Sequence, residues 1–267
     1  MTKNTERSWH ILAALLLCLF FTGVAPPAVS TVEAPAEWMQ TSLAQLAGES
    51  SQVLLVVGDE SMGFTARLHL LEKRGNVWKA AFPHLAALIG AKGFAPPGWK
   101  KEGDVKTPSG VFALKRTFGY PPNIPSRMPY RQVMDDDIWV DDISSPDYNR
   151  WVKAELSSLS AQTKFMPLRY KKGETAAVSF EIMKRPDHQY KYGIVIEYNT
   201  EPVVKGAGSA IFFHVRRGEN KPTLGCVALA ESDMLKVLGW LDPGCKPLVV
   251  LGTRQSIVSL FRGAADE

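Results

Sequence analysis

A histidine and a cysteine, twelve positions apart near the C-terminal end of the chain, are the side chains best suited to covalent chemistry. His214 ends an apolar run at residues 208–215, and Cys226 opens another at residues 226–229. A thiol reacts as the thiolate, which forms at neutral pH only beside a base or a positive group. Gly218, Asn220 and Pro222 between the two runs predict a loop and a return that bring the imidazole to the thiol.

Gly225 stands directly before the cysteine. A glycine lets the backbone approach a substrate closely, because it has no side chain. The N–H groups of Gly225 and Cys226 are therefore candidate oxyanion donors, each contributing about 3–4 kcal/mol to transition-state stabilisation.

The other cysteines leave a second interpretation of Cys226 open. The chain has three, Cys18, Cys226 and Cys245. In an exported protein two remaining cysteines commonly form a disulfide, so pairing of Cys226 with Cys245 competes with a nucleophilic role. The histidine upstream and the glycine beside Cys226 favour the nucleophile.

The N-terminus has the organisation of a cleaved secretory signal peptide over residues 1–30. Lys3 and Arg7 precede an uncharged apolar run at residues 11–24, and small residues follow at Ala28 and Ser30. The run is shorter than the roughly 20 residues that span a bilayer, although an uncleaved anchor is the alternative. We predict export to the periplasm or cell envelope with no stable membrane span.

Composition and charge exclude several classes of function. The net charge of +4 comes without a long Lys/Arg block, so we expect no nucleic-acid partner. Cysteines and histidines are too widely spaced for a zinc site, and we expect neither a metal nor a cofactor. The acidic residues at 135–137 and 141–142 are interpreted as a solvated loop, since they lack the glycine and terminal glutamate of a calcium-binding loop.

The pattern of elements predicts a mainly β fold without a second domain. Strands are expected at residues 52–57, 64–70, 76–81, 111–115, 178–183, 192–198 and 248–251, besides those that carry His214 and Cys226. The best helix spans residues 231–241, where apolar residues recur at three- and four-residue spacing. Residues 38–46 predict a short helix, and residues 147–159 an irregular helical stretch.

Three segments resemble the L,D-transpeptidase (YkuD-like) family. The first is His214 followed by Thr-Leu-Gly-Cys-Val at residues 223–227, similar to the Ser/Thr-x-Gly-Cys-Val motif of that family. The second spans residues 102–112 and ends in Lys-Thr-Pro-Ser-Gly-Val-Phe, similar to the Lys/Arg-Thr-Pro-x-Gly-x-Phe segment of the family, and the third is Tyr198-Asn199. The resemblance covers most of the chain from about residue 52 to residue 251, with the three segments in family order.

The resemblance implies a YkuD-like β-sandwich or barrel with one or two peripheral helices. It implies a catalytic domain at residues 51–254, after a linker and short segment at 31–50 and before a tail at 255–267. Cys226 would attack the L,D-amide of a peptidoglycan stem peptide, and His214 would transfer the proton. The thioester would pass to an amine acceptor, a second stem peptide or another amine. We expect a monomer.

The sequence also departs from the commoner family pattern. Leu224 stands where many members have histidine, and Ala228 where many have arginine. A substrate carboxylate therefore needs another partner, and Arg216, Arg217 and Thr223 are the nearest candidates for substrate binding; both arginines are also consistent with solvated loop charges. A hydrolase of the same fold (L,D-carboxypeptidase or amidase-like) and a non-catalytic wall-binding module remain the alternatives.

Overall fold

The apolar runs at the two ends of the predicted domain lie side by side in the computed structural model. It describes residues 32–45, 49–59, 63–155, 168–169 and 176–262, which belong to one compact unit. Val53 of one run pairs in parallel with Leu248 of the other, and the strands stay in register to their ends. The predicted signal peptide lies outside the described residues, as do residues 156–159 of the helical stretch expected at 147–159.

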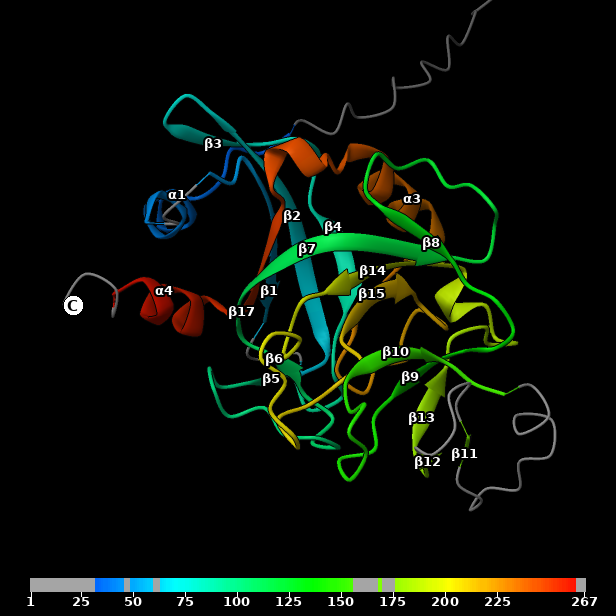
Figure 1. The fold of residues 1–267 in the computed structure, drawn as a ribbon. Coiled ribbons are helices and arrows are strands. Elements are labelled where there is room, and N and C mark those ends of the chain that lie inside the picture. Colours follow the sequence, from blue (N-terminus) through cyan, green and yellow to red (C-terminus); the bar gives the residue numbers. More distant parts are fainter. Residues whose placement is uncertain (1–31, 46–48, 60–62, 156–167, 170–175, 263–267) are drawn as a thin grey trace, which may run out of the picture. The chain divides into compact units, whose positions relative to one another are not determined.

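Eight strands close into a mixed barrel (Figure 1). In spatial order they are β1 (Gln52–Gly58), β17 (Leu248–Thr253), β7 (Gly110–Gly119), β14 (Tyr192–Ile196), β15 (Phe212–Val215), β16 (Val227–Leu229), β4 (Leu85–Leu88) and β2 (Thr65–Arg74), and β2 pairs again with β1. The pairs β1–β17 and β15–β16 are parallel, whereas the remaining barrel pairs are antiparallel. The predicted mainly β barrel is confirmed.

Short strands extend the barrel or form small sheets beside it. β3 (Val77–Ala80) and β8 (Tyr130–Gln132) join the barrel sheet at β2 and β7. The separate pairs are β5 (Phe94–Ala95) with β6 (Thr107–Pro108) and β11 (Leu168–Arg169) with β12 (Ala176–Ala177). A three-stranded sheet contains β10 (Arg150–Lys153), β9 (Asp137–Val140) and β13 (Phe180–Ile182).

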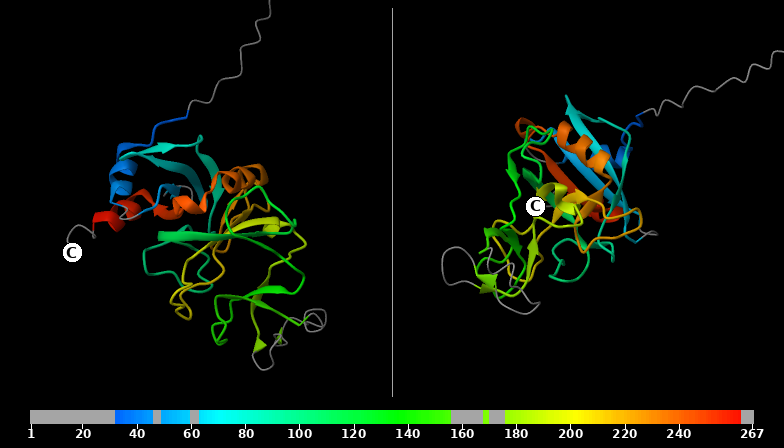
Figure 2. Two further views of the ribbon diagram at one scale, coloured as in Figure 1. Left: turned by 45° about the horizontal axis from the view of Figure 1, so that its top comes forward. Right: turned by 90° about the vertical axis from the view of Figure 1, so that its right-hand side faces the viewer.

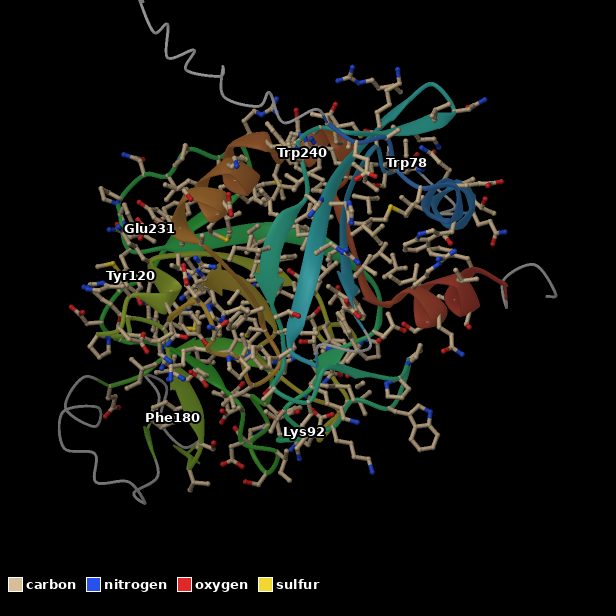
Figure 3. The ribbon with its side chains drawn as sticks, turned by 180° about the vertical axis from the view of Figure 1, so that it is seen from behind. Trp78, Lys92, Tyr120, Phe180, Glu231 and Trp240 are labelled. Carbon is tan, nitrogen blue, oxygen red and sulfur yellow. The ribbon has the colours of Figure 1, made fainter. Side chains whose placement is uncertain are left out.

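The described residues form three α-helices: α1 (Glu37–Ala44), α3 (Glu231–Trp240) and α4 (Arg254–Arg262). Met234 and Leu238 of α3 enter the barrel core, whereas Leu43 of α1 and Ile257 of α4 pack on the outer face of β1. α1 and α4 lie side by side, as the left view of Figure 2 shows. In Figure 3, Trp240 at the end of α3 and Trp78 of β3 lie at the end of the barrel opposite Lys92. None of these helices is long and apolar enough to cross a membrane.

Strand β1 is buried on both of its faces, which explains why its sequence is apolar at each position from Val53 to Val57. Leu54 and Val56 face the barrel interior, while Val53, Leu55 and Val57 face α1 and α4. A strand that is buried on both faces reads as a continuous apolar run. The helices outside the barrel are therefore the reason that this run shows no period of two.

Two expectations for the middle of the chain are wrong. Residues 150–153 form strand β10, paired with β9, and not part of a helix. The acidic segment is not a solvated loop, since Asp137 is fully buried and Asp142 nearly so. The Asp137 carboxylate accepts hydrogen bonds from Trp151 Nε1 at 2.9 Å and Met134 N at 2.7 Å, and pairs with Arg131 at 2.6 Å. These partners satisfy a charge that burial would otherwise make unfavourable.

Replacement of Asp137 by alanine is expected to lower the free energy of unfolding by about 3–5 kcal/mol, because it leaves buried donors and cations without their acceptor. Asp135→Ala is the matched control: the Asp135 side chain is 73% exposed and pairs with Lys184, so the change is expected to be below about 0.5 kcal/mol. Urea unfolding of both variants measures the difference. Equal losses would contradict the structural role of Asp137.

Candidate active site

Strands β15 and β16 bring the predicted nucleophile and base together. They run in parallel, with His214 opposite Ala228 and Phe213 opposite Val227. Cys226 lies two residues before Ala228, so its side chain projects from the same face of the sheet as that of His214. The sequence predicted a strand followed by a loop that returns beside it. Because β15 and β16 are parallel, the segment between them must run back to the starting end of β15 before β16 begins.

The pair lies on the outer face of the barrel. Phe213 and Val227 belong to the interior core, whereas Phe212 and Cys226 pack with Trp139 in a second cluster. Trp139 belongs to the three-stranded sheet, which Figure 2 shows beside the barrel strands β14 and β15. The small sheet therefore covers the face from which the cysteine and the histidine project.

The Cys226 side chain is only 9% exposed and is held by two backbone groups. Sγ donates to the Ala210 carbonyl oxygen at 3.2 Å and accepts from the Phe212 N–H at 3.4 Å. Burial raises the pKa of this thiol to about 12. The resting side chain is therefore a protonated thiol, whose nucleophilicity depends on removal of its proton by a base.

The His214 imidazole is held as a neutral base. Its Nδ1 lies 2.8 Å from the carbonyl oxygen of Val215, and because a carbonyl can only accept, Nδ1 carries the proton and Nε2 has a free lone pair. Burial lowers the pKa of His214 to about 4. The ring of Tyr190 packs edge-on against the imidazole, with centroids 5.5 Å apart.

Thr223 and Gly225 shape the turn that leads into the cysteine. The Thr223 hydroxyl donates to the Cys226 carbonyl oxygen at 2.7 Å and accepts from the Gly225 N–H at 3.1 Å. Gly225 has a φ of +156°, and a side chain there would meet the backbone oxygen of Lys106 at 3.0 Å. Since the Gly225 N–H already has an acceptor, the Cys226 N–H is the better placed of the two predicted oxyanion donors.

A cavity of about 430 Å³ contains both reactive side chains. Predicted site residues that line it are Cys226, His214, Gly225, Thr223 and Arg217. Arg216 is absent from the lining and lies 3.6 Å from Glu219. The structure therefore separates the two arginines that the sequence treats alike.

Sequence reasoning missed several charged residues of this cavity. The lining also includes Lys100, Glu102, Asp141, Glu181 and Arg185. Glu102 is the first residue of the segment at residues 102–112 that resembles the family, and Lys100 stands two residues before it; this segment is the sequence signal that pointed to the region, although neither residue was predicted as part of the site. Asp141 and Glu181 come from the three-stranded sheet and its connections, and neither lies in a segment that resembles the family.

Arg185 and Glu102 are already engaged by protein groups. The Arg185 guanidinium contacts Asp187 and Glu181, both at 2.9 Å. Glu102 accepts hydrogen bonds from Tyr148 at 2.6 Å and from Ser209 at 2.7 Å. Neither group is therefore a free charge for a substrate.

The cysteines that the structure describes are both free. Cys226 is buried, and Cys245 lies half-buried in the short helix η2 (Pro243–Cys245). The alternative of a Cys226–Cys245 disulfide is therefore not formed here. Over the same described part, groups of three or more His, Cys, Asp or Glu side chains placed to hold a metal ion are not found.

A closed barrel that presents a cysteine and a histidine from adjacent strands in one cavity defines a candidate cysteine-dependent catalytic domain. The family model of the YkuD L,D-transpeptidase catalytic domain matches residues 65–250. The chain therefore belongs to the YkuD family of L,D-transpeptidase catalytic domains, whose activity is directed at cell-wall peptidoglycan. No curated protein and no solved structure matches the chain.

Proposed function

We propose that the protein is a cysteine acyltransferase that acts on peptidoglycan stem peptides through a thioester at Cys226, with His214 as the base. The observation that carries the proposal is that a thiol and an imidazole with a free Nε2 line one cavity. The predicted catalytic domain at residues 51–254 includes every group that the reaction uses. The N-terminal features and the family's activity on the wall support a location in the cell envelope.

The acylation step begins when the Cys226 proton moves to His214 Nε2 and sulfur bonds to the carbonyl carbon of the L,D-amide. The oxyanion is stabilised by the Cys226 N–H. The C–N bond then breaks, the imidazolium gives its proton to the leaving amine, and a thioester remains. In the second step an acceptor amine forms a new C–N bond while the C–S bond breaks and the thiol regains a proton.

The resting hydrogen bond of the thiol to Ala210 must open before this step. Sγ donates to the Ala210 carbonyl, so the S–H bond must turn away from this oxygen before its proton can pass to the imidazole. Such loose apo geometry is common in catalytic pairs and tightens when substrate binds. The thiol therefore stays protonated until a peptide enters the cavity.

Arg217 is the residue that we propose for a substrate carboxylate, since it lines the cavity. A guanidinium suits a carboxylate in a bidentate contact, and hydrogen bonds to charged groups contribute about 1.5–3 kcal/mol. Arg217→Ala is therefore expected to lower kcat/KM about 10- to 100-fold, mainly through KM. Arg216→Ala, outside the cavity, is the control. Similar losses in both variants would contradict this assignment.

Intact-protein mass spectrometry after incubation with digested peptidoglycan tests the function. We expect an acyl adduct on Cys226 that persists in Cys245→Ser and disappears when an amine is added. Muropeptide products separate the outcomes: exchanged amine supports the transferase, and trimmed stems without exchange identify the hydrolase of the same fold. Binding without any adduct or product change would replace the proposal by a non-catalytic wall-binding module.

A further inference from the structure

Lys100 is a buried lysine in the wall of the catalytic cavity. Its side chain is 4% exposed, and it stands in the loop that joins β5 to β6. Burying an ammonium group is costly unless the charge is paired. Nothing in the assignment of the nucleophile and the base explains why a lysine occupies this position.

The ammonium of Lys100 is fixed by two contacts within its own loop. Nζ donates to Asp104 Oδ1 at 2.6 Å and to the Lys101 carbonyl oxygen at 2.9 Å. Asp104 is held in turn by the backbone N–H groups of Lys101 and Lys106, both at 2.9 Å. The lysine therefore has a defined position, set by a carboxylate that is itself anchored to the backbone.

The stem of Lys100 passes between two glycines that flank the nucleophile in space. A side chain at Gly208 would meet Lys100 Cγ at 3.0 Å, and one at Gly225 would lie 3.7 Å from Lys100 Cε. Both glycines have positive φ, +101° and +156°. The stem of Lys100 therefore packs against the backbone at Gly208 and at Gly225, the residue directly before Cys226.

Only the cationic member of this ion pair belongs to the cavity lining. Lys100 lines the cavity, whereas Asp104 does not. Among the charged groups around Cys226, Lys100 and Arg185 favour the thiolate and Glu181 opposes it. Arg185 is neutralised by Glu181 and Asp187. The neighbouring His214 and Tyr190 are uncharged at neutral pH. Arg217 also lines the cavity, but Lys100, with Asp104 as its ion-pair partner, is the cation that packs against the backbone at Gly225, next to the thiol.

We propose that Lys100 is a positioning residue for the reaction: its stem holds the Gly225–Cys226 backbone, and its ammonium stabilises the negative charge that develops on Cys226 and on the oxyanion. The inference rests on the proposed function for the identity of the reaction. The effect on the thiol itself requires no substrate and can be measured alone. A fixed charge in the wall of a partly dry cavity is worth more than one in water.

Alkylation of Cys226 by iodoacetamide between pH 7 and pH 9 tests the proposal, with mass spectrometry of the Cys226 peptide to separate it from the other cysteines. Below the thiol pKa the rate is proportional to the thiolate fraction. Lys100→Met is expected to lower the rate about tenfold at each pH, which is one unit of pKa. Lys100→Arg is expected to keep most of the wild-type alkylation rate, because the positive charge remains. Thermal unfolding checks that each variant is folded.

Asp104→Asn is expected to change the alkylation rate of Cys226 in the direction opposite to Lys100→Met. It keeps the ammonium and removes the compensating negative charge, so alkylation is expected to become faster at each pH. A merely structural role would move both variants in the same direction. If Lys100→Met does not fold, Asp104→Asn carries the test alone: a faster rate supports the inference, and an unchanged or slower rate overturns it.

The two proposals fail separately. An unchanged alkylation rate in folded Lys100→Met overturns the role of Lys100 even if the wild-type protein forms the acyl adduct. An absent adduct overturns the proposed function even if Lys100 and Asp104 shift the alkylation rate as expected. In the active enzyme, Lys100→Met is further expected to lower kcat more than it raises KM, because the charge acts on the transition state.

Discussion

Replacement of Cys226 by alanine is expected to abolish turnover of muropeptides, a loss on the order of 10⁶-fold, because no other group can carry the acyl intermediate. In the described part of the chain the cavity holds one thiol, and Cys245 is not in its lining. Product formation followed by mass spectrometry, together with KM where residual activity permits, measures the loss. Binding of the stem peptide is expected to survive.

The fold of Cys226→Ala is expected to stay intact. The substitution removes one buried sulfur that makes two weak hydrogen bonds, to Ala210 and Phe212, and we expect the free energy of unfolding to fall by about 1 kcal/mol. Cys245→Ser is the matched control, expected to keep wild-type activity. Substantial turnover in Cys226→Ala, or inactivity in Cys245→Ser, would contradict the assignment of Cys226 as the nucleophile.

Most of the barrel strands were predictable because their burial patterns are local, whereas β4 (Leu85–Leu88) was not among the strands expected from the sequence. Along β2, Ala66, Leu68 and Leu70 are buried and Arg67 is exposed, which gives the period of two that the sequence shows. Helix α3 was predictable for the same reason, since one apolar face follows from three- and four-residue spacing. That Cys226 and His214 line one cavity was predictable from the turn formers between them and from the glycine beside Cys226.

The small sheet over the site was not predictable, because its pairing is not local. β10 is a strand through its contact with β9, and tertiary pairing overrides a weak helical pattern. Asp137 reads as a solvent-exposed acid until Arg131 and Trp151 are placed around it. Lys100 was missed for the same reason: its burial depends on Gly208 and Gly225, more than a hundred positions away.

His214→Ala is expected to lower kcat about 10²- to 10⁴-fold, the usual contribution of a general base. The resting thiol has a pKa of about 12, so without Nε2 to take its proton little nucleophile forms at neutral pH. Added imidazole is expected to restore part of the rate, because the deleted ring leaves room in the cavity. Steady-state kinetics with and without imidazole measures both effects. A His214→Ala variant that keeps full activity would exclude His214 as the base.

The pH dependence distinguishes His214 from its acidic neighbour. The base works only when neutral, and burial lowers the pKa of His214 to about 4, so kcat/KM is expected to fall as pH drops through about 4. Burial also raises the pKa of Asp141, in the same cavity, to about 6. If the acidic limb of kcat/KM near pH 4 remains in Asp141→Asn, it belongs to His214.

The depressed pKa of His214 also means that the folded state loses stability as pH falls from about 6.5 toward 4, because protons bind the unfolded imidazole first. Acid unfolding of His214→Ala should therefore show a weaker pH dependence in this window than that of the wild-type protein. In the kinetic experiment, an acidic limb of kcat/KM that shifts in Asp141→Asn would assign the titration to the Asp141 carboxylate.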